Sequence, residues 1–276
     1  MKHLGDKDSR LNGIYWIEDA GPCSAVYVLD GGRTLIDAGN MYGLIDEIED
    51  LVSPEKIERV ILTHSHFDHV GGLVEIYQIA NPDLYVHKLT RGYLDLHRPP
   101  FPEFFAALQK EGKLKFIEEG DAIKGDHKLE VLHTPGHTAG DICLYLPDIK
   151  TLASGDLVLG ADHQYGLVLS KPDEVCGGRM KDRISSLKRL LSLDVRTLLP
   201  GHGSPIISNG HDQIKIQLLE SFRIQEGKNS EVPWLRMAEV LQEINDLKGA
   251  LDCCREALKI NPDCNDALQI AAEIES

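Results

Sequence analysis

Six consecutive residues, His64-Ser65-His66-Phe67-Asp68-His69, constrain this chain of 276 residues more than any other feature. They supply three imidazoles and one carboxylate, ligands that suit zinc, iron or manganese. Directly before them, residues 57–62 read IERVIL, an apolar run typical of a buried strand. A lone histidine is usually structural, but four such side chains at one strand-to-helix turn are hard to place in a core or on a solvated face. The motif therefore predicts a metal site at the end of a buried strand.

Three later fragments repeat this arrangement of a polar side chain after a strand-like run. They are Thr134-Pro135-Gly136-His137, Ser154-Gly155-Asp156 and Leu199-Pro200-Gly201-His202. Each fragment follows an apolar, β-branched run, so each candidate ligand is expected at the C-terminal edge of a strand. A rigid strand end can hold a ligand in fixed geometry, which favours a site assembled from all four fragments.

Hydrophobic periodicity predicts an α/β chain in which strands and helices alternate. The region 88–112 is expected to be helical and to cover the cleft. The expected strands are 14–19, 23–30, 33–37, 57–62, 84–87, 114–117, 128–133, 142–146, 150–154 and 196–199, and the expected helices are 41–52, 70–80, 180–193 and 211–226.

Taken together, these motifs resemble the metallo-β-lactamase-fold superfamily over roughly residues 12–226. The resemblance implies an αββα sandwich, with two facing sheets, helices outside and metals at one sheet edge. Carried over by motif, it assigns His64, His66 and His137 to a first metal, Asp68, His69 and His202 to a second, and Asp156 as the bridge between them. It implies two divalent ions per chain, zinc in the first instance, with iron and manganese as alternatives.

Details of the motifs favour particular branches of that superfamily. The bridging Asp156 resembles the glyoxalase II, lactonase, ribonuclease and flavo-diiron branches, whereas the main zinc β-lactamases replace it. The stretches 155–160, 186–190 and 200–205 are similar to the small β-lactamase-like hydrolases. The resemblance implies a hydrolase of a small ester, thioester or lactone, in which a metal-bridging hydroxide attacks. Asp68 is the expected catalytic residue, because it would orient the water while ligating the second metal.

Two other functions stay open at this stage. A phosphodiesterase or ribonuclease of the same fold is one, and a metal-binding interaction protein that docks through its C-terminal helices is the other. Nucleic-acid affinity comes largely from clustered Lys and Arg. The formal net charge is −15, and the sequence has no run of basic residues, so a nucleic-acid partner is disfavoured and a small-molecule substrate is expected.

Two residues outside the ligand set are candidates for supporting roles. Ligating imidazoles need acceptors for their other N–H, and Asp37, at the end of an expected strand, could serve as one. Its alternative role is to cap a turn. His163 could line the pocket, and its alternative is a surface histidine.

The C-terminal fifth of the chain has a different character. Residues 227–230 read as a linker between a hydrolase domain (1–226) and a helical extension (227–276). Residues 234–262 resemble one tetratricopeptide-type repeat, and helices are expected at 234–244, 247–260 and 264–275; a plain helical hairpin is the alternative. About three repeats are needed for independent stability, so the extension should lean on the hydrolase domain, on a second copy or on a protein partner. Its expected buried residues are Trp234, Leu251, Cys254 and Leu258.

Cysteine usage and hydropathy bear on the compartment. Six scattered cysteines without a CxxC pair are expected to be reduced, buried thiols, which favours the cytoplasm. The N-terminal residues do not read as a signal peptide, and no stretch approaches the roughly 18 apolar residues of a membrane span.

Overall fold

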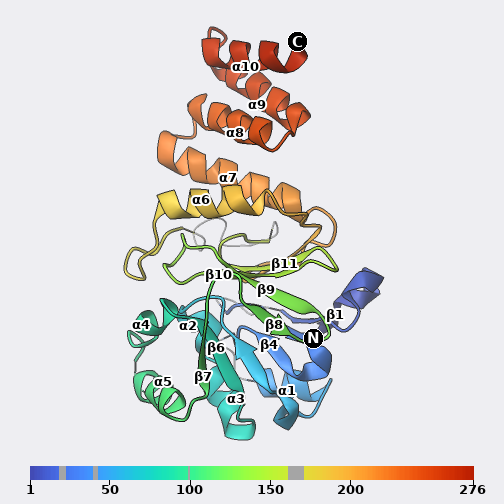
Figure 1. The fold of residues 1–276 in the computed structure, drawn as a ribbon, viewed down its shortest axis with the longest axis vertical. Coiled ribbons are helices and arrows are strands. Elements are labelled where there is room, and N and C mark those ends of the chain that lie inside the picture. The colour runs from blue at the N-terminus through green and yellow to red at the C-terminus, as the bar shows by residue number, and fades with distance from the viewer. Residues whose placement is uncertain (19–22, 40–42, 99, 161–170) are drawn as a thin grey trace.

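The computed structural model describes residues 1–18, 23–39, 43–98, 100–160 and 171–276. Two β-sheets lie face to face, with helices on their outer sides (Figure 1). The expected αββα sandwich is therefore confirmed.

The first sheet has seven strands in sequence order, antiparallel from β1 to β4 and parallel from β4 to β7. Its strands are β1 (Lys2–His3), β2 (Tyr15–Ile17), β3 (Val26–Leu29), β4 (Thr34–Ile36), β5 (Arg59–Ile61), β6 (Asp83–His87) and β7 (Leu114–Ile117).

The second sheet has five strands in the order β12-β11-β10-β9-β8, and only the β11–β12 pair is parallel. Its central strand β10 is buried along its whole length, which explains its unbroken apolar sequence ICLYL. The strands are β8 (Ala122–Lys124), β9 (Lys128–His133), β10 (Ile142–Leu146), β11 (Thr151–Gly155) and β12 (Thr197–Pro200).

Three apolar layers hold the sandwich together. One lies between the sheets and includes Trp16, Ile61 and Leu144. The other two lie on the outer faces, one around Phe105 beside the first sheet and one around Leu187 beside the second. The helices are α1 (Leu44–Glu49), α2 (Phe67–Val70), α3 (Leu73–Ile79), α4 (Thr90–Leu94), α5 (Phe101–Lys110), α6 (Met180–Leu190), α7 (Gly210–Glu226), α8 (Val232–Glu243), α9 (Leu247–Ile260) and α10 (Asn265–Glu275).

The observed elements differ from the expected ones in a few places. Strands β1 and β8 were not expected, because two or three residues are too few to show a period. Region 88–112 is helical. Tyr93 of α4 lines a groove together with Ala139, whereas α5 packs on the outer face of the first sheet through Phe105 and Leu108. Residues 19, 41–42 and 99, which belong to an expected strand, an expected helix and the region 88–112, lie outside the described residues.

The C-terminal helices continue the outer layer of the second sheet as a stack in which α7 lies on α6 and α8 on α7 (Figure 1). At the α7–α8 contact, the guanidinium of Arg236 lies 4.5 Å from the ring of Phe222, and that of Arg223 lies 4.8 Å from the ring of Trp234. The Nζ atom of Lys215 lies 2.6 Å from an oxygen of Asp246. The helical extension thus packs against the rest of the chain.

The four residues expected in the buried part of this extension differ in how far they are buried. Cys254 is buried, whereas Trp234 and Leu258 are partly buried against the same apolar layer. Leu251 is only partly buried and lies outside that layer. The alanines at 238, 250 and 257 of α8 and α9 are instead fully buried in that apolar layer.

Candidate metal centre

Every residue predicted as a ligand lies in a loop or short helix that follows a strand. His64 follows β5, His137 follows β9, Asp156 follows β11 and His202 follows β12. Strands β9, β11 and β12 run in one direction, because β10 is antiparallel to both β9 and β11. Their C-terminal ends therefore meet at a single edge of the second sheet, opposite the loop that follows β5.

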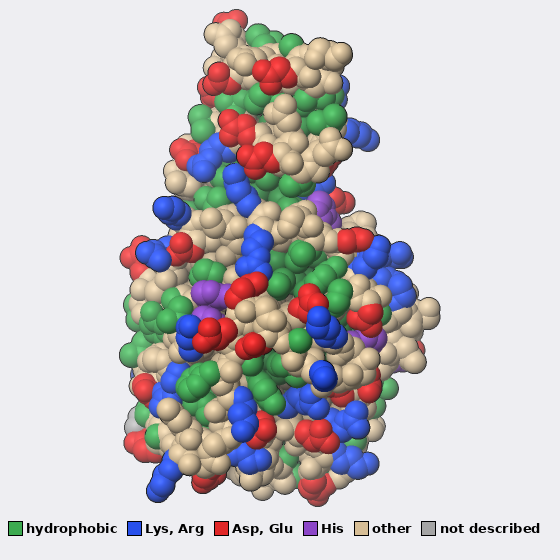
Figure 2. Space-filling model, viewed as in Figure 1, with side chains coloured by type: hydrophobic (Ala, Val, Ile, Leu, Met, Phe, Trp, Pro, Cys, Tyr) green, Lys and Arg blue, Asp and Glu red, His purple; other side chains and the backbone are tan. Residues whose placement is uncertain are grey.

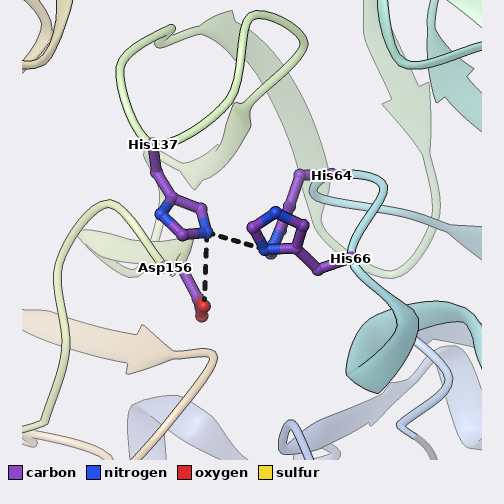
Figure 3. Close-up of side chains that lie close together, drawn as sticks. All are labelled: His64, His66, His137 and Asp156. Atoms are coloured by element: carbon purple, nitrogen blue, oxygen red, sulfur yellow. Dashed lines mark hydrogen bonds and ion pairs between the residues drawn. The ribbon is translucent and has the colours of Figure 1, made fainter. Parts of the chain in front are cut away.

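All seven residues come together there, in two groups of potential ligands that share one carboxylate. In each group the candidate ligand atoms lie within 4.8 Å of one another. The first group is His64, His66, His137 and Asp156 (Figure 3), and the second is Asp68, His69, Asp156 and His202. The division into two sets joined by Asp156 matches the one that the sequence motifs implied.

The hydrogen bonds around the first group leave lone pairs that face one another. His137 Nδ1 donates to the carbonyl of Lys171 at 2.8 Å, so its Nε2 is left as an acceptor. His66 Nε2 lies 2.9 Å from a carboxylate oxygen of Asp173, which leaves Nδ1 as an acceptor in the neutral ring. These two inner nitrogens, His137 Nε2 and His66 Nδ1, are 2.9 Å apart (Figure 3).

A buried ring nitrogen without a hydrogen-bond partner also bears on whether this group could hold a cation. His64 is 1% exposed, and its Nε2 has no hydrogen-bond partner among the described residues. Buried polar atoms are normally hydrogen-bonded, and lone pairs held face to face repel each other unless a cation lies near them. This donor set therefore fits a metal ion.

Asp37 is confirmed as the carboxylate behind a candidate ligand. One of its oxygens accepts from the backbone amide of Thr63 at 2.7 Å, and the other lies 2.8 Å from His69 Nδ1. The Thr63 hydroxyl donates to that second oxygen at 2.8 Å. The two alternative roles thus coexist, because Asp37 fixes the turn and the His69 ring together. Its φ of 59° is one that Asp adopts more readily than most residues.

Burial and nearby charges set the protonation of the centre. Burial, with the neighbouring His69 and His66, holds the pKa of His64 well below its ordinary value, and burial lowers the pKa of His137 to about 4. Burial works against a charge on Asp156, but the imidazoles of His69 and His202 outweigh it and hold its pKa well below the ordinary value. Neutral His64 and His137 beside an ionised Asp156 are the forms that bind metals. Burial works against a charge on His69, but the carboxylates of Asp37 and Asp156 outweigh it and raise its pKa well above the ordinary value, so His69 must lose a proton to bind a metal.

The sequence interpretation assigned no role at the site to the segment 171–178. Asp173 lies 107 residues from His66 in the chain and belongs to no motif, so nothing in the sequence pointed to their contact. Gly178 is pressed against the same loop, since a Cβ atom there would lie 2.1 Å from the carbonyl oxygen of His137. His97 was not assigned a role either, and its Nε2 lies 2.6 Å from the carbonyl oxygen of Ser65. His163 lies outside the described residues.

Comparison with known proteins identifies the family. Residues 19–202 match the metallo-beta-lactamase superfamily, and the chain belongs to that family. It is 30% identical over 236 residues to the acyl-coenzyme A thioesterase MBLAC2 of Homo sapiens, a match that covers 73% of this chain and 80% of that protein. The chain is thus a hydrolase of the superfamily, and its His/Asp cluster indicates divalent metal ions.

Two solved structures are similar as well. TTHA1623, solved in a di-iron-bound form, is 28% identical with a TM-score of 0.50, covering 69% of this chain and 93% of that one. ST1585 from Sulfolobus tokodaii is 19% identical with a TM-score of 0.57, covering 87% and 98% respectively, and supports the fold alone.

The surface carries charged side chains of both signs. On the face shown in Figure 2, Lys and Arg side chains are interspersed with Asp and Glu, and the described residues form no broad basic patch there. None of the helices in the described ranges is long and apolar enough to cross a membrane. All six cysteines are buried.

Proposed function

We propose that this chain hydrolyses small acyl thioesters at a centre of two metal ions. The observation that carries the proposal is the pair of four-residue ligand groups that share the buried Asp156. The substrate class is supported by the relative named as an acyl-coenzyme A thioesterase, which aligns with most of both chains. Esters and lactones are the neighbouring substrates that the same centre could take.

The proposed ligands are those of the two groups, with Asp156 common to both. When bound, two metal ions lower the pKa of a water and polarise the oxygen of the substrate carbonyl. Zinc suits the set of imidazoles and carboxylates, as does iron, which TTHA1623 contains. In thioester hydrolysis, a water oxygen bonds to the carbonyl carbon and the C–S bond breaks. The products are a carboxylic acid and a thiol.

Asp68 is the proposed catalytic residue. Its side chain is 23% exposed, whereas those of His69, His202 and Asp156 are at most 3% exposed, so Asp68 is the member of the second group most open to a substrate. Burial works against its charge, but the imidazole of His69 and a hydrogen bond from His202 lower its pKa. An ionised carboxylate in this position can accept a proton from an attacking water and orient it.

A groove beside the first ligand group offers room for the rest of a substrate. It has a volume of about 890 Å³ and is lined in part by Ala139 and Lys171, which flank His137 in the structure. Tyr93, Met180 and Ile224 supply apolar surface farther along it. This combination suits an acyl chain with a polar end near Lys171.

We propose in addition that residues 1–226 form the hydrolase domain and that 227–276 form a tetratricopeptide-like extension that stacks on it. The continuous apolar layer from Leu187 through Phe222 to Ala257 supports an extension that depends on the domain. The end of the stack, with Leu268 49% exposed, could pair with a second copy or a protein partner. A cytoplasmic location is supported by the free, buried thiols of Cys143, Cys176, Cys253, Cys254 and Cys264.

A substrate panel tests the proposed activity. The metal-loaded full chain is assayed against an acyl thioester, an aryl ester, a lactone, a phosphodiester and a β-lactam, with the chelator-treated chain as the control. We expect the highest kcat/KM for the thioester and no turnover after chelation. A preference for the phosphodiester would instead favour the nuclease alternative.

A further inference from the structure

One short segment holds two of the three histidines of the first ligand group. The carbonyl oxygen of Lys171 accepts from His137 Nδ1 at 2.8 Å, and Asp173 contacts His66 Nε2 at 2.9 Å. The same segment is bonded to the backbone of the His137 loop, since the amide of Asp173 donates to the carbonyl of His137 at 2.8 Å. The amide of Ala139 donates to the carbonyl of Cys176 at 2.9 Å.

The carboxylate of Asp173 is itself held in place by backbone donors. Its Oδ1 accepts from the amides of Val175 at 2.9 Å and Cys176 at 3.4 Å. Its Oδ2 is therefore the atom left to face His66 Nε2. Both oxygens of Asp173 are used, so the side chain has a single orientation in which it can satisfy all of its partners.

We propose that Asp173 is a positioning residue that fixes the proton of His66 on Nε2 and thereby presents Nδ1 to the first metal. This inference rests on the proposed metal centre. Asp173 would not touch the substrate or the metal, and it acts only through the ring of His66. Partners of this kind fix the orientation of ligating histidines and raise their basicity.

His66, Asp173 and Cys176 also form a group whose atoms could hold a metal ion of their own. The hydrogen bonds favour the positioning role over a separate metal site. Burial and a hydrogen bond to Asp173 raise the pKa of the Cys176 thiol to about 11. The thiol is a hydrogen-bond donor to the carboxylate, and both oxygens of Asp173 already have partners in His66 and two backbone amides.

In the isosteric substitution Asp173→Asn, the neighbouring groups allow only one orientation of the new side chain. The amides of Val175 and Cys176 still require an acceptor, so the Asn oxygen must stay where Oδ1 lies now. The amide NH2 group then faces His66 Nε2, which can only accept from it. The ring proton is forced onto Nδ1, the nitrogen that the first metal needs.

The experiment uses the zinc-loaded full chain and long-range 1H–15N NMR of the histidine rings. In the wild-type protein we expect His66 to carry its proton on Nε2, whereas His69 and His137 carry theirs on Nδ1. In Asp173→Asn, competition with a chelator should show a loss of zinc affinity of about 10- to 100-fold at one of the two sites. The matched control is Asp148→Asn, which alters an exposed His–Asp pair with His127 and should leave zinc affinity unchanged.

The outcomes separate this inference from the proposed function. A wild-type chain that binds no zinc contradicts the metal centre itself. A chain that binds two zinc ions but carries the His66 proton on Nδ1 overturns the role of Asp173 alone, as does Asp173→Asn with wild-type zinc affinity. Because the NMR measurement is made on the wild-type protein, it decides the question even if the variant does not fold.

Discussion

Ending the chain at Lys228 removes α8, α9 and α10 and uncovers the side of α7 on which they stack. Phe222 is 0% exposed in the full chain, and the guanidinium of Arg236 lies 4.5 Å from its ring. The truncation also removes the ion pair between Lys215 and Asp246. All seven candidate ligands, which lie between residues 64 and 202, remain in place.

The size of the effect follows from the surface that is exposed. Full burial of a Phe side chain contributes about 1.5–3 kcal/mol. For a chain of this length, 1 kcal/mol corresponds to a change in Tm of about 2–4 °C. The truncated protein should therefore melt about 3–12 °C lower and have lower solubility or a new oligomeric state, while its metal content is unchanged. Thermal melting, light scattering and elemental analysis measure these quantities side by side.

The substitution Phe222→Gln supplies the control, because it should harm the full chain and benefit the truncated chain. In the full chain it removes a buried aromatic side chain and should destabilise by roughly 3 kcal/mol or more. In the truncated chain the same position is uncovered, and a polar residue there should restore solubility. A truncated protein with the Tm, solubility and mass of the full chain would refute the idea that the extension is part of the folded unit.

Three further predictions concern the centre. Asp68→Ala should abolish thioester turnover while the melting curve keeps its cooperative shape. Activity within about tenfold of wild type, a loss of only ~1.4 kcal/mol, would mean that another group orients the attacking water. Asp37→Asn should weaken metal binding by about 10- to 100-fold, measured by competition with a chelator, and unchanged affinity would argue against its role. Gly178→Ala should lower metal content, because the added methyl group meets the carbonyl of His137. Gly92→Ala, which meets no atom within 4 Å, is its control, and equal metal content in both variants would contradict the contact.

The sequence allowed the fold and all seven candidate ligands to be predicted, because its local motifs carry a resemblance to a known superfamily that implies both. Strand periodicity is visible within five or six residues, and His64, His137, Asp156 and His202 each follow such a run. A role for Asp37 beside a ligating imidazole could also be anticipated, since it lies at the end of an expected strand, but the sequence did not identify His69 as its partner.

The remaining features depend on packing between distant segments. Asp173 contacts His66 from a loop without regular structure, and no periodicity relates the two residues. Similarly, the sequence suggested that large side chains such as Leu251 form the buried part of the extension. In the structure Leu251 is only partly buried, and the alanines at 238, 250 and 257 are fully buried in the apolar layer that α8 and α9 share. Which face of an amphipathic helix is covered depends on its neighbour as well as on its own pattern.

The metal content of the full chain, purified without chelators, tests the central claim most directly. The two ligand groups that share Asp156 predict two equivalents of transition metal per chain, and one equivalent in a His202→Ala variant. A wild-type chain that reaches only one equivalent at full loading, with His202 turned away from the metal in a refined structure, would contradict the binuclear centre.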